Sequence, residues 1–299
     1  MVFFSRFGVL SYPCIVLACV LFFFLFYFFL SKGKKIAEII ESSRILNVTI
    51  VFVSVVFCSS MFAGVKSLFS YFPTWLYFLL ITLALVACFF VARKGIRGLE
   101  KTNLFLMPAT SLLFLVVMIY AMRNSSNFEF DTSLNFAGLL FSPLYVALNT
   151  CMSGLVICKA GDGLSKKQTV LACLFSSILL LIFLFFGNFI LQHNGESFFA
   201  EMPFLFLTSG NSVMFAIAFF VIFVGCFTTL ISLCFTLKNS FDKVVQNETF
   251  STLLAVFVPF GLSVLGFSQI VSFLYPICSV LGIGVLVFLG ISTMVHKRN

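Results

Sequence analysis

Residues 9–30 read VLSYPCIVLACVLFFFLFYFFL, and the basic segment SKGKK follows directly at 31–35. An apolar run of about 20 residues is long enough to cross the hydrocarbon layer of a membrane as a helix. The segment after it is typical of a cytoplasmic loop, because short loops rich in Lys and Arg resist translocation. This unit, an apolar run followed by a gap of known charge, repeats along the chain and predicts its fold.

The composition predicts a membrane protein. The 299 residues are 61% hydrophobic and 9% charged, with a mean hydropathy of +1.17, whereas soluble proteins have about 25% charged residues. A soluble core cannot hide this much apolar surface, so we expect the lipid bilayer to be the main partner. The net charge of +8 is explained by the loops, and a nucleic-acid partner is not expected, because such proteins cluster basic residues on a polar face.

Nine apolar runs follow one another along the chain, each long enough for a spanning helix. They are residues 9–30, 46–70, 73–93, 104–122, 136–158, 166–192, 209–238, 250–267 and 269–293. The first run exceeds the roughly 7–15 residues of a signal-peptide core and lacks a small-residue cleavage site, so we interpret it as a retained span. The short links at 70–73 and 267–269 predict tight hairpins.

Lysine and arginine gather in every second gap between the runs. Fifteen of the 18 Lys and Arg residues lie in the gaps 31–45, 93–103, 159–168 and 238–249 and in the tail, with Lys297 and Arg298. The exceptions are Arg6, Lys66 and Arg123. The positive-inside rule therefore places the first eight residues outside and the tail inside. An odd number of spans with an outside start suggests that a first helix is missing.

Two segments between the runs have helical character. Residues 34–44, KKIAEIIESSR, place Ile36, Ile39 and Ile40 on one face, which predicts an amphipathic helix along the inner surface. Residues 196–207, ESFFAEMPFLFL, mix acidic with bulky apolar side chains on the predicted outer side. They predict a surface helix or a plug over a cavity. An ordinary interfacial loop is the alternative for both segments.

The run 136–158, FAGLLFSPLYVALNTCMSGLVIC, is the most irregular. Pro143 cannot donate a backbone hydrogen bond and clashes with the preceding turn, and polar residues follow it at mid-span. A broken helix at this depth is tolerated where protein or water lines it, and such breaks bind substrate and ions in secondary transporters. A simple proline kink is the alternative.

The run 209–238 contains a second polar group, GCFTTLISL at 225–233. Its adjacent hydroxyls, on Thr228 and Thr229, predict oxygen ligands for a small cation, or hydrogen bonds to the carbonyl one turn back. No Asp or Glu lies inside any run, which argues against a carboxylate proton relay. Lys66 lies near the outer end of its run and is expected to extend to the interface.

The residues that carry enzyme chemistry are sparse. The two histidines are His193 and His296, and no nucleophile motif or metal-ligand cluster is present. The 10 cysteines all lie inside apolar runs without a C-x-x-C spacing, which is typical of buried thiols that pack as small hydrophobes. We therefore do not expect an enzyme.

The order of the runs, SPLYVALN at 142–149 and GCFTTLISL at 225–233 resemble the YkvI-like family of bacterial membrane proteins. That family is placed near the amino acid–polyamine–organocation transporters, and the resemblance extends over nearly the whole chain. It implies an all-α polytopic protein of the bacterial cytoplasmic membrane with the leucine-transporter fold. Its single transmembrane domain would hold an incomplete first inverted repeat at 1–122 and a second at 136–299. The broken helix of the second repeat would be 136–158, and the segment 196–207 would cover the substrate cavity.

The resemblance also implies a function, the transport of a small solute such as an amino acid or related metabolite by alternating access. The residues implied to bind the solute are Ser142, Pro143, Tyr145 and Asn149. Those implied to bind Na⁺, as the coupling ion, are Thr228 and Thr229; no other cofactor is implied.

The start of the chain departs from the family. Members begin with a broken helix of the kind GAGFASG, whereas this chain opens with MVFFSRFG, which resembles the segment just after that helix. We therefore expect nine spans of ten. Two other interpretations remain open: a non-transporting sensor or receptor subunit, as in the spore germinant receptors, and an inactive truncated paralogue.

Overall fold

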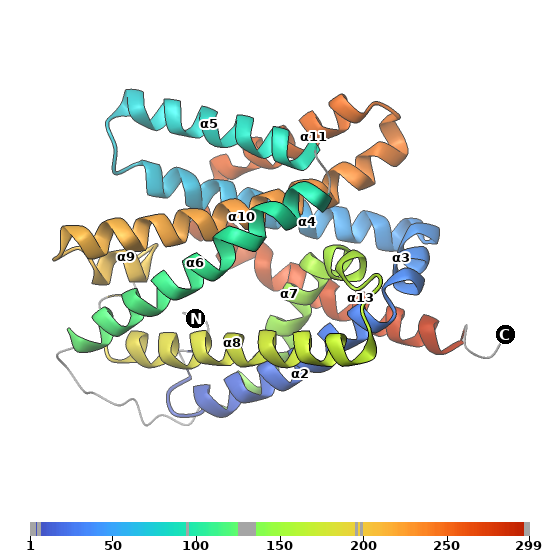
Figure 1. The fold of residues 1–299 in the computed structure, drawn as a ribbon, viewed down its shortest axis with the longest axis horizontal. Coiled ribbons are helices and arrows are strands. Elements are labelled where there is room, and N and C mark those ends of the chain that lie inside the picture. Colours follow the sequence, from blue (N-terminus) through green and yellow to red (C-terminus); the bar gives the residue numbers. More distant parts are fainter. Residues whose placement is uncertain are drawn as a thin grey trace.

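The computed structural model describes residue 4 and residues 7–93, 96–124, 136–194, 197 and 200–295, and its regular elements are helices (Figure 1). The long helices are α2 (Ser11–Ser31), α4 (Arg44–Phe69), α5 (Thr74–Arg93), α6 (Ile96–Arg123), α7 (Ala137–Ala160), α8 (Lys166–Gln192), α10 (Ser212–Val245), α11 (Glu248–Leu262) and α13 (Tyr275–Val295). The short elements are α3 (Gly33–Ser42), α9 (Pro203–Leu207), α12 (Phe267–Gln269), the 3-10 segment η2 (Ser263–Leu265) and the π-helical segment η3 (Ile270–Leu274).

Eight helical segments in the described part of the chain are long and apolar enough to cross a membrane. They correspond to the predicted runs except 136–158, which forms the 24-residue helix α7. The run 209–238 is longer than predicted, because α10 continues to Val245. Lys238 and Lys243 therefore lie in a helix, although the sequence assigned them to a loop. The expectations for residues 1–3, 5 and 6 and for the tail at 296–299 lie outside the described residues.

The broken helix predicted at 136–158 is wrong, because α7 is continuous through Pro143. A proline removes one backbone hydrogen bond, here the one to the carbonyl of Leu139. The ring of Pro143 is exposed, so it does not disturb the side of α7 that packs. That side lies against α2 and α13, and these contacts hold the helix together.

The irregular helix is instead the last one. The hairpin before it turns at Gly266, whose φ is +87°, slightly earlier than the link predicted at 267–269. The π-helical segment η3 then leads into α13. Pro276 lacks the N–H that would bond the carbonyl of Ser272 in an α-helix, and a locally widened turn relieves this mismatch.

The helices form two groups that meet along α7 and α13 (Figure 1). In one group α4 and α10 pack at the centre, with α5 and α11 above them in this view, and share a core that includes Phe57, Leu230 and Leu233. In the other group α2 packs on both α7 and α8, around Ile15, Val146 and neighbouring residues. Helix α6 contacts both groups, through α10 and α8.

The two short predicted helices have different outcomes. Helix α3 confirms the amphipathic prediction for 34–44, because Ile36, Ile39 and Ile40 are all buried. They pack with side chains of α2, α7 and α13. In the second segment only α9 is a helix, with Phe204 and Leu205 buried; residues 196, 198 and 199 lie outside the described part.

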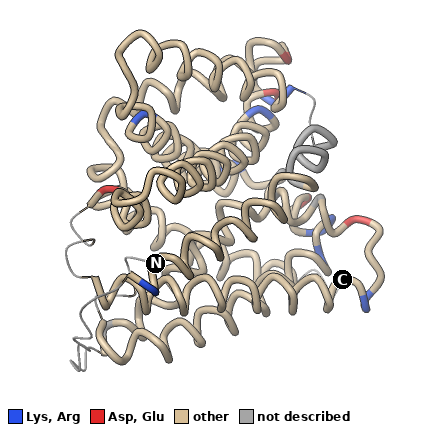
Figure 2. The backbone as a smooth tube through the Cα atoms, turned by 60° about the vertical axis from the view of Figure 1, so that its left-hand side comes forward, with Lys and Arg blue, Asp and Glu red and all other residues tan. Residues whose placement is uncertain are grey.

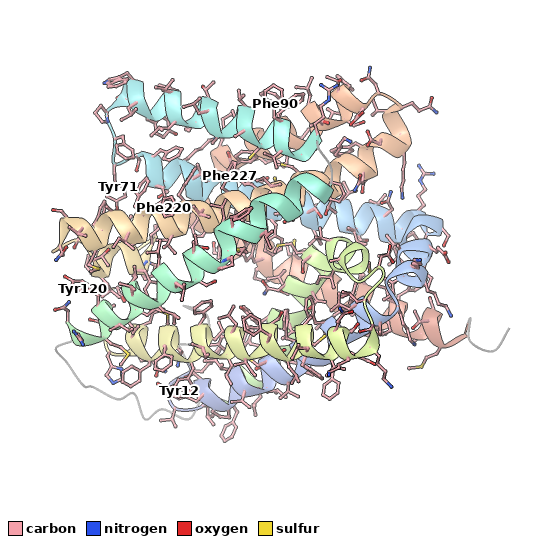
Figure 3. The ribbon with its side chains drawn as sticks, viewed as in Figure 1. Tyr12, Tyr71, Phe90, Tyr120, Phe220 and Phe227 are labelled. Carbon is pink, nitrogen blue, oxygen red and sulfur yellow. The ribbon has the colours of Figure 1, made fainter. Side chains whose placement is uncertain are left out.

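The two ends of the bundle carry different side chains. Lys and Arg gather mostly at the end where the C-terminus lies (Figure 2). The labelled Tyr71 and Tyr120 lie at the opposite end (Figure 3), near the start of α5 with its exposed Trp75. Tyrosine and tryptophan are enriched at membrane–water interfaces, so this end has the composition of a membrane boundary.

Candidate functional site

The four residues predicted to bind solute all lie on α7, and each has different surroundings. Ser142 is buried, and its hydroxyl donates to the carbonyl of Cys14 on α2 at 2.9 Å. Pro143 beside it is exposed. Tyr145 meets Phe4 edge to face, with ring centroids 5.1 Å apart. The amide of Asn149 donates to the carbonyl of Tyr145 at 2.8 Å. Because α7 is continuous, its backbone groups are largely bonded within the helix, and the carbonyl of Leu139 is the one that loses its helical donor to Pro143.

The hydroxyls predicted to bind Na⁺ bond to their own helix. Thr228 is buried and donates to the carbonyl of Val224 at 3.0 Å, and Thr229 donates to that of Gly225 at 2.8 Å. This is the alternative that the sequence left open, the bond one turn back. A hydroxyl that donates keeps lone pairs that a cation can use, so the ligand prediction stays a prediction. Among described residues, no hydrogen bond joins the pair to the α7 residues.

A buried polar contact that the sequence did not predict joins α4 to α13. The hydroxyls of Ser60 and Tyr275 are 2.5 Å apart, and Ser60 is fully buried. Tyr275 is the first residue after η3, and its ring lies 4.3 Å from that of Phe57. Proline next to Tyr275 inside an apolar run was the available signal, since π-helical turns are frequent at functional sites.

Two further hydroxyls on helices that pack together are buried without a hydrogen-bond partner in the described part of the chain. They belong to Ser54 on α4 and Thr150 on α7. Helices α4, α7 and α13 pack against one another. A buried polar atom left unpaired is costly, and water or an ion often supplies its partner. We call Ser54, Ser60, Thr150 and Tyr275 the interior polar set, and it is the candidate solute and ion site.

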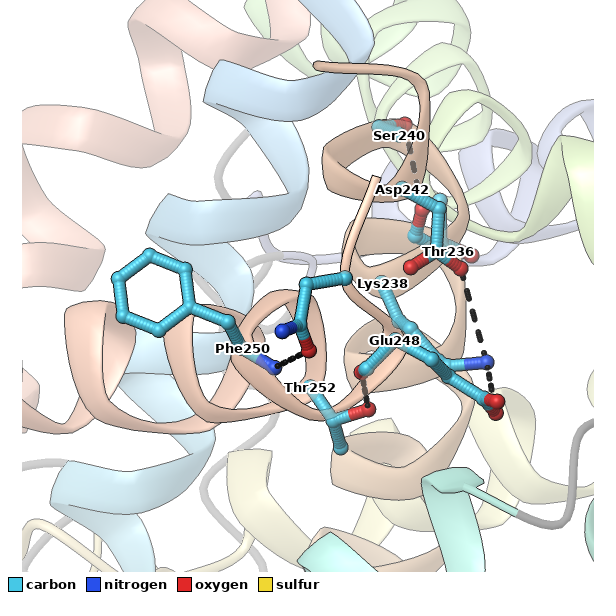
Figure 4. Close-up of polar contacts among 8 residues, drawn as sticks. Thr236, Lys238, Ser240, Asp242, Glu248, Phe250 and Thr252 are labelled. Atoms are coloured by element: carbon cyan, nitrogen blue, oxygen red, sulfur yellow. Dashed lines mark hydrogen bonds and ion pairs between the residues drawn. The ribbon is translucent and has the colours of Figure 1, made fainter. Parts of the chain in front are cut away.

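A charged cluster closes the hairpin between α10 and α11 (Figure 4). The ammonium of Lys238, whose side chain is only 10% exposed, lies 2.9 Å from Glu248 Oε1 and 3.5 Å from Asp242 Oδ2. Asn247 caps α11 by accepting from the N–H of Phe250 at 3.1 Å. These contacts explain why Lys238 is tolerated inside a helix. They connect two successive helices.

A second polar cluster, which includes Lys66, lies at the opposite end. The ammonium of Lys66 donates to the hydroxyl of Ser263 at 2.6 Å and lies 4.1 Å from the centroid of the Phe260 ring. Nearby, the carboxylate of Glu201 accepts from Ser67 at 2.6 Å and from Ser268 at 3.3 Å. The segment before α9 is therefore joined to both α4 and α12.

The chemistry that the described residues offer is binding by hydroxyl and carbonyl oxygens. In the part of the chain that the structure describes, no group of three His, Cys, Asp or Glu side chains is placed to hold a metal ion. The long apolar helices define a polytopic α-helical membrane protein. No family model, no curated protein and no solved structure matches this chain.

Proposed function

We propose that this protein is a secondary transporter of a small solute, such as an amino acid or a related metabolite, coupled to Na⁺ and working by alternating access. One observation carries the proposal: several helix–helix contacts of the first half of the chain recur when each helix is replaced by its counterpart from the second half. Inverted structural repeats of this kind underlie many secondary transporters.

The corresponding helices come in the same order in the two halves of the chain. Helices α2, α3, α4, α5 and α6 correspond to α8, α9, α10, α11 and α13, and α4 and α10 lie together at the centre. Helix α11 packs on α4 as α5 packs on α10, and α13 contacts α3 as α6 contacts α9. This agreement supports two inverted repeats with the leucine-transporter arrangement. Helix α7 has no counterpart among the described helices.

The two helix groups provide the moving parts that alternating access needs. In such folds one group rocks against the other around a site near the membrane centre. The interior polar set comes from α4, from α13 and from α7 of the second group, three helices that pack on one another, and Thr228 lies on α10, which packs on α4. Hydroxyl oxygens suit Na⁺, a hard cation that prefers oxygen ligands. The gathering of Lys and Arg at the end with the C-terminus supports an inside C-terminus in the bacterial cytoplasmic membrane.

The proposal is tested with purified protein in proteoliposomes. A panel of amino acids and related metabolites is first screened for thermal stabilisation in Na⁺ against K⁺, and hits are assayed for uptake driven by an inward Na⁺ gradient. The variant Thr228→Val/Thr229→Val removes both hydroxyls but keeps their shape, and should raise the Na⁺ concentration needed for half-maximal uptake.

Thr236→Val is the matched control. Thr236 lies on the same helix, is buried, and donates to the carbonyl one turn back at 3.1 Å. Its replacement by valine therefore shows what the loss of such a hydrogen bond does to the helix and to uptake apart from any loss of Na⁺ binding. An equal effect in both variants would refute the assignment of Thr228 and Thr229. Solute binding without uptake would favour a sensor or receptor subunit and would overturn transport.

A further inference from the structure

A cavity of about 370 Å³ lies at the corner where α2 turns into α3. Its lining comes from this corner, from the turn after α7 and from the end of α13: Leu30, Ser31, Lys32, Gly33, Lys34, Lys35, Gly161, Asp162, Gly163 and Thr293. Three lysines and one aspartate therefore face one space. Because α2 and α13 are spanning helices that end here, the cavity lies at the level where lipid head groups begin.

The positive charge of this cavity is not neutralised within the described part of the chain. Asp162 forms no ion pair there with any lysine of the lining. Lys35 donates to the carbonyl of Thr293 at 3.3 Å. Lys32 and Lys34 are exposed, and the ammonium of Lys32 lies 5.7 Å from the centroid of the Phe28 ring. Two ammonium groups thus remain available to a ligand.

The backbone at the corner is shaped by close packing. A Cβ added to Gly33 would lie 2.4 Å from the carbonyl oxygen of Cys158, and one added to Gly161 would lie 2.5 Å from that of Leu30. The corner and the turn after α7 therefore meet backbone to backbone, so the lysines project from a fixed frame. The cavity also faces the first turn of α3, which has no side-chain cap, and the positive end of a helix dipole adds to the attraction for an anion.

We propose that this corner cavity binds the phosphate of an anionic phospholipid head group, with Lys32 and Lys34 as its main contacts. Basic pockets between spanning helices are suited to such head groups. The net positive lining selects a lipid with a net negative charge over a zwitterionic one, whose own cation would meet the lysines. Exposed apolar side chains of α2, such as Val20 and Phe24, leave room for acyl chains along the helix. The site does not depend on transport.

The experiment titrates the detergent-solubilised full chain with phosphatidylglycerol and with phosphatidylcholine and measures bound lipid by native mass spectrometry. We expect tighter binding of phosphatidylglycerol. Lys32→Gln/Lys34→Gln should weaken it by about thirtyfold, since each lysine near an anionic head group contributes about 1 kcal/mol. Both lysines are exposed, so the thermal midpoint should stay unchanged and separate lost binding from lost folding.

Lys166→Gln/Lys167→Gln is the matched control, with the same change of charge on exposed residues of the first turn of α8, outside the cavity lining. Equal weakening in both variants, or no preference for phosphatidylglycerol in the native chain, would overturn the site. Millimolar inorganic phosphate is then added as a competitor. Failure to displace the lipid supports a lipid site, and displacement by phosphate alone would reassign the cavity to a soluble phosphate compound.

Discussion

Single residues set how closely the helices of this protein approach. Gly33 and Gly161 hold no side chain where the corner of α2 and α3 meets the end of α7. Gly284 on α13 lacks a side chain too, but no heavy atom lies within 4 Å of an added Cβ there. The same residue type therefore has a packing role at one position and none at the other.

This difference predicts opposite effects of alanine. Gly33→Ala places a Cβ 2.4 Å from a backbone oxygen, so helices must separate, and we expect the free energy of unfolding in detergent to fall by about 1–3 kcal/mol. Gly284→Ala should leave it unchanged or raise it by up to about 1 kcal/mol, because alanine is the better helix former. An unchanged Gly33→Ala variant would contradict the close contact.

The hydroxyl pair of Ser60 and Tyr275 gives a second prediction at this scale. Ser60 also donates to the carbonyl of Phe57 at 2.8 Å, so Tyr275→Phe leaves its hydroxyl with a partner. We expect the unfolding free energy to fall by only about 0.6 kcal/mol, the average for hydrogen bonds between membrane helices. A double-mutant cycle with Ser60→Ala measures the coupling, and additive effects would show that the contact contributes nothing.

At the scale of elements, prolines show what the sequence predicts well and what it does not. Pro143 and Pro276 both lie inside apolar runs, and each removes one backbone hydrogen bond. The chain stays α-helical through Pro143, whose ring is exposed, and is π-helical just before Pro276. The sequence shows where a proline removes a backbone hydrogen bond. Packing with residues far along the chain determines whether the helix stays α-helical there or widens into a π-helical turn.

The α10–α11 hairpin yields a prediction about buried charge. Asp242→Asn/Glu248→Gln keeps the shape of both side chains but leaves the ammonium of Lys238 buried without a carboxylate. We expect a clear fall in the thermal midpoint, because an uncompensated buried charge is costly. Lys238→Met removes that charge, and the 56%-exposed Glu248 side chain remains in contact with water, so the midpoint should change much less. A larger fall in the thermal midpoint for Lys238→Met than for Asp242→Asn/Glu248→Gln would contradict the role of the two carboxylates as partners of Lys238.

At the scale of the whole molecule, the spans could be predicted and the candidate site could not. Apolar length and the alternation of basic gaps are local properties, and they located the spanning helices and the hairpin at 70–73. The interior polar set depends on contacts such as Ser60 with Tyr275, which lie 215 residues apart. One serine among several in an apolar run gives no local signal of its partner, so only the packing identifies it.

The orientation of the molecule is the last prediction and rests on the positive-inside rule. Nine of the 10 native cysteines are buried and Cys226 is half-buried, so a membrane-impermeant maleimide should react weakly with the native chain. Tyr71→Cys, at an exposed turn, should be labelled in intact cells. Gln246→Cys, at the exposed turn after α10, should react only after the membrane is opened, because the Lys and Arg of that end hold it inside. Labelling of Gln246→Cys alone in intact cells would show that the orientation is the opposite of the one proposed.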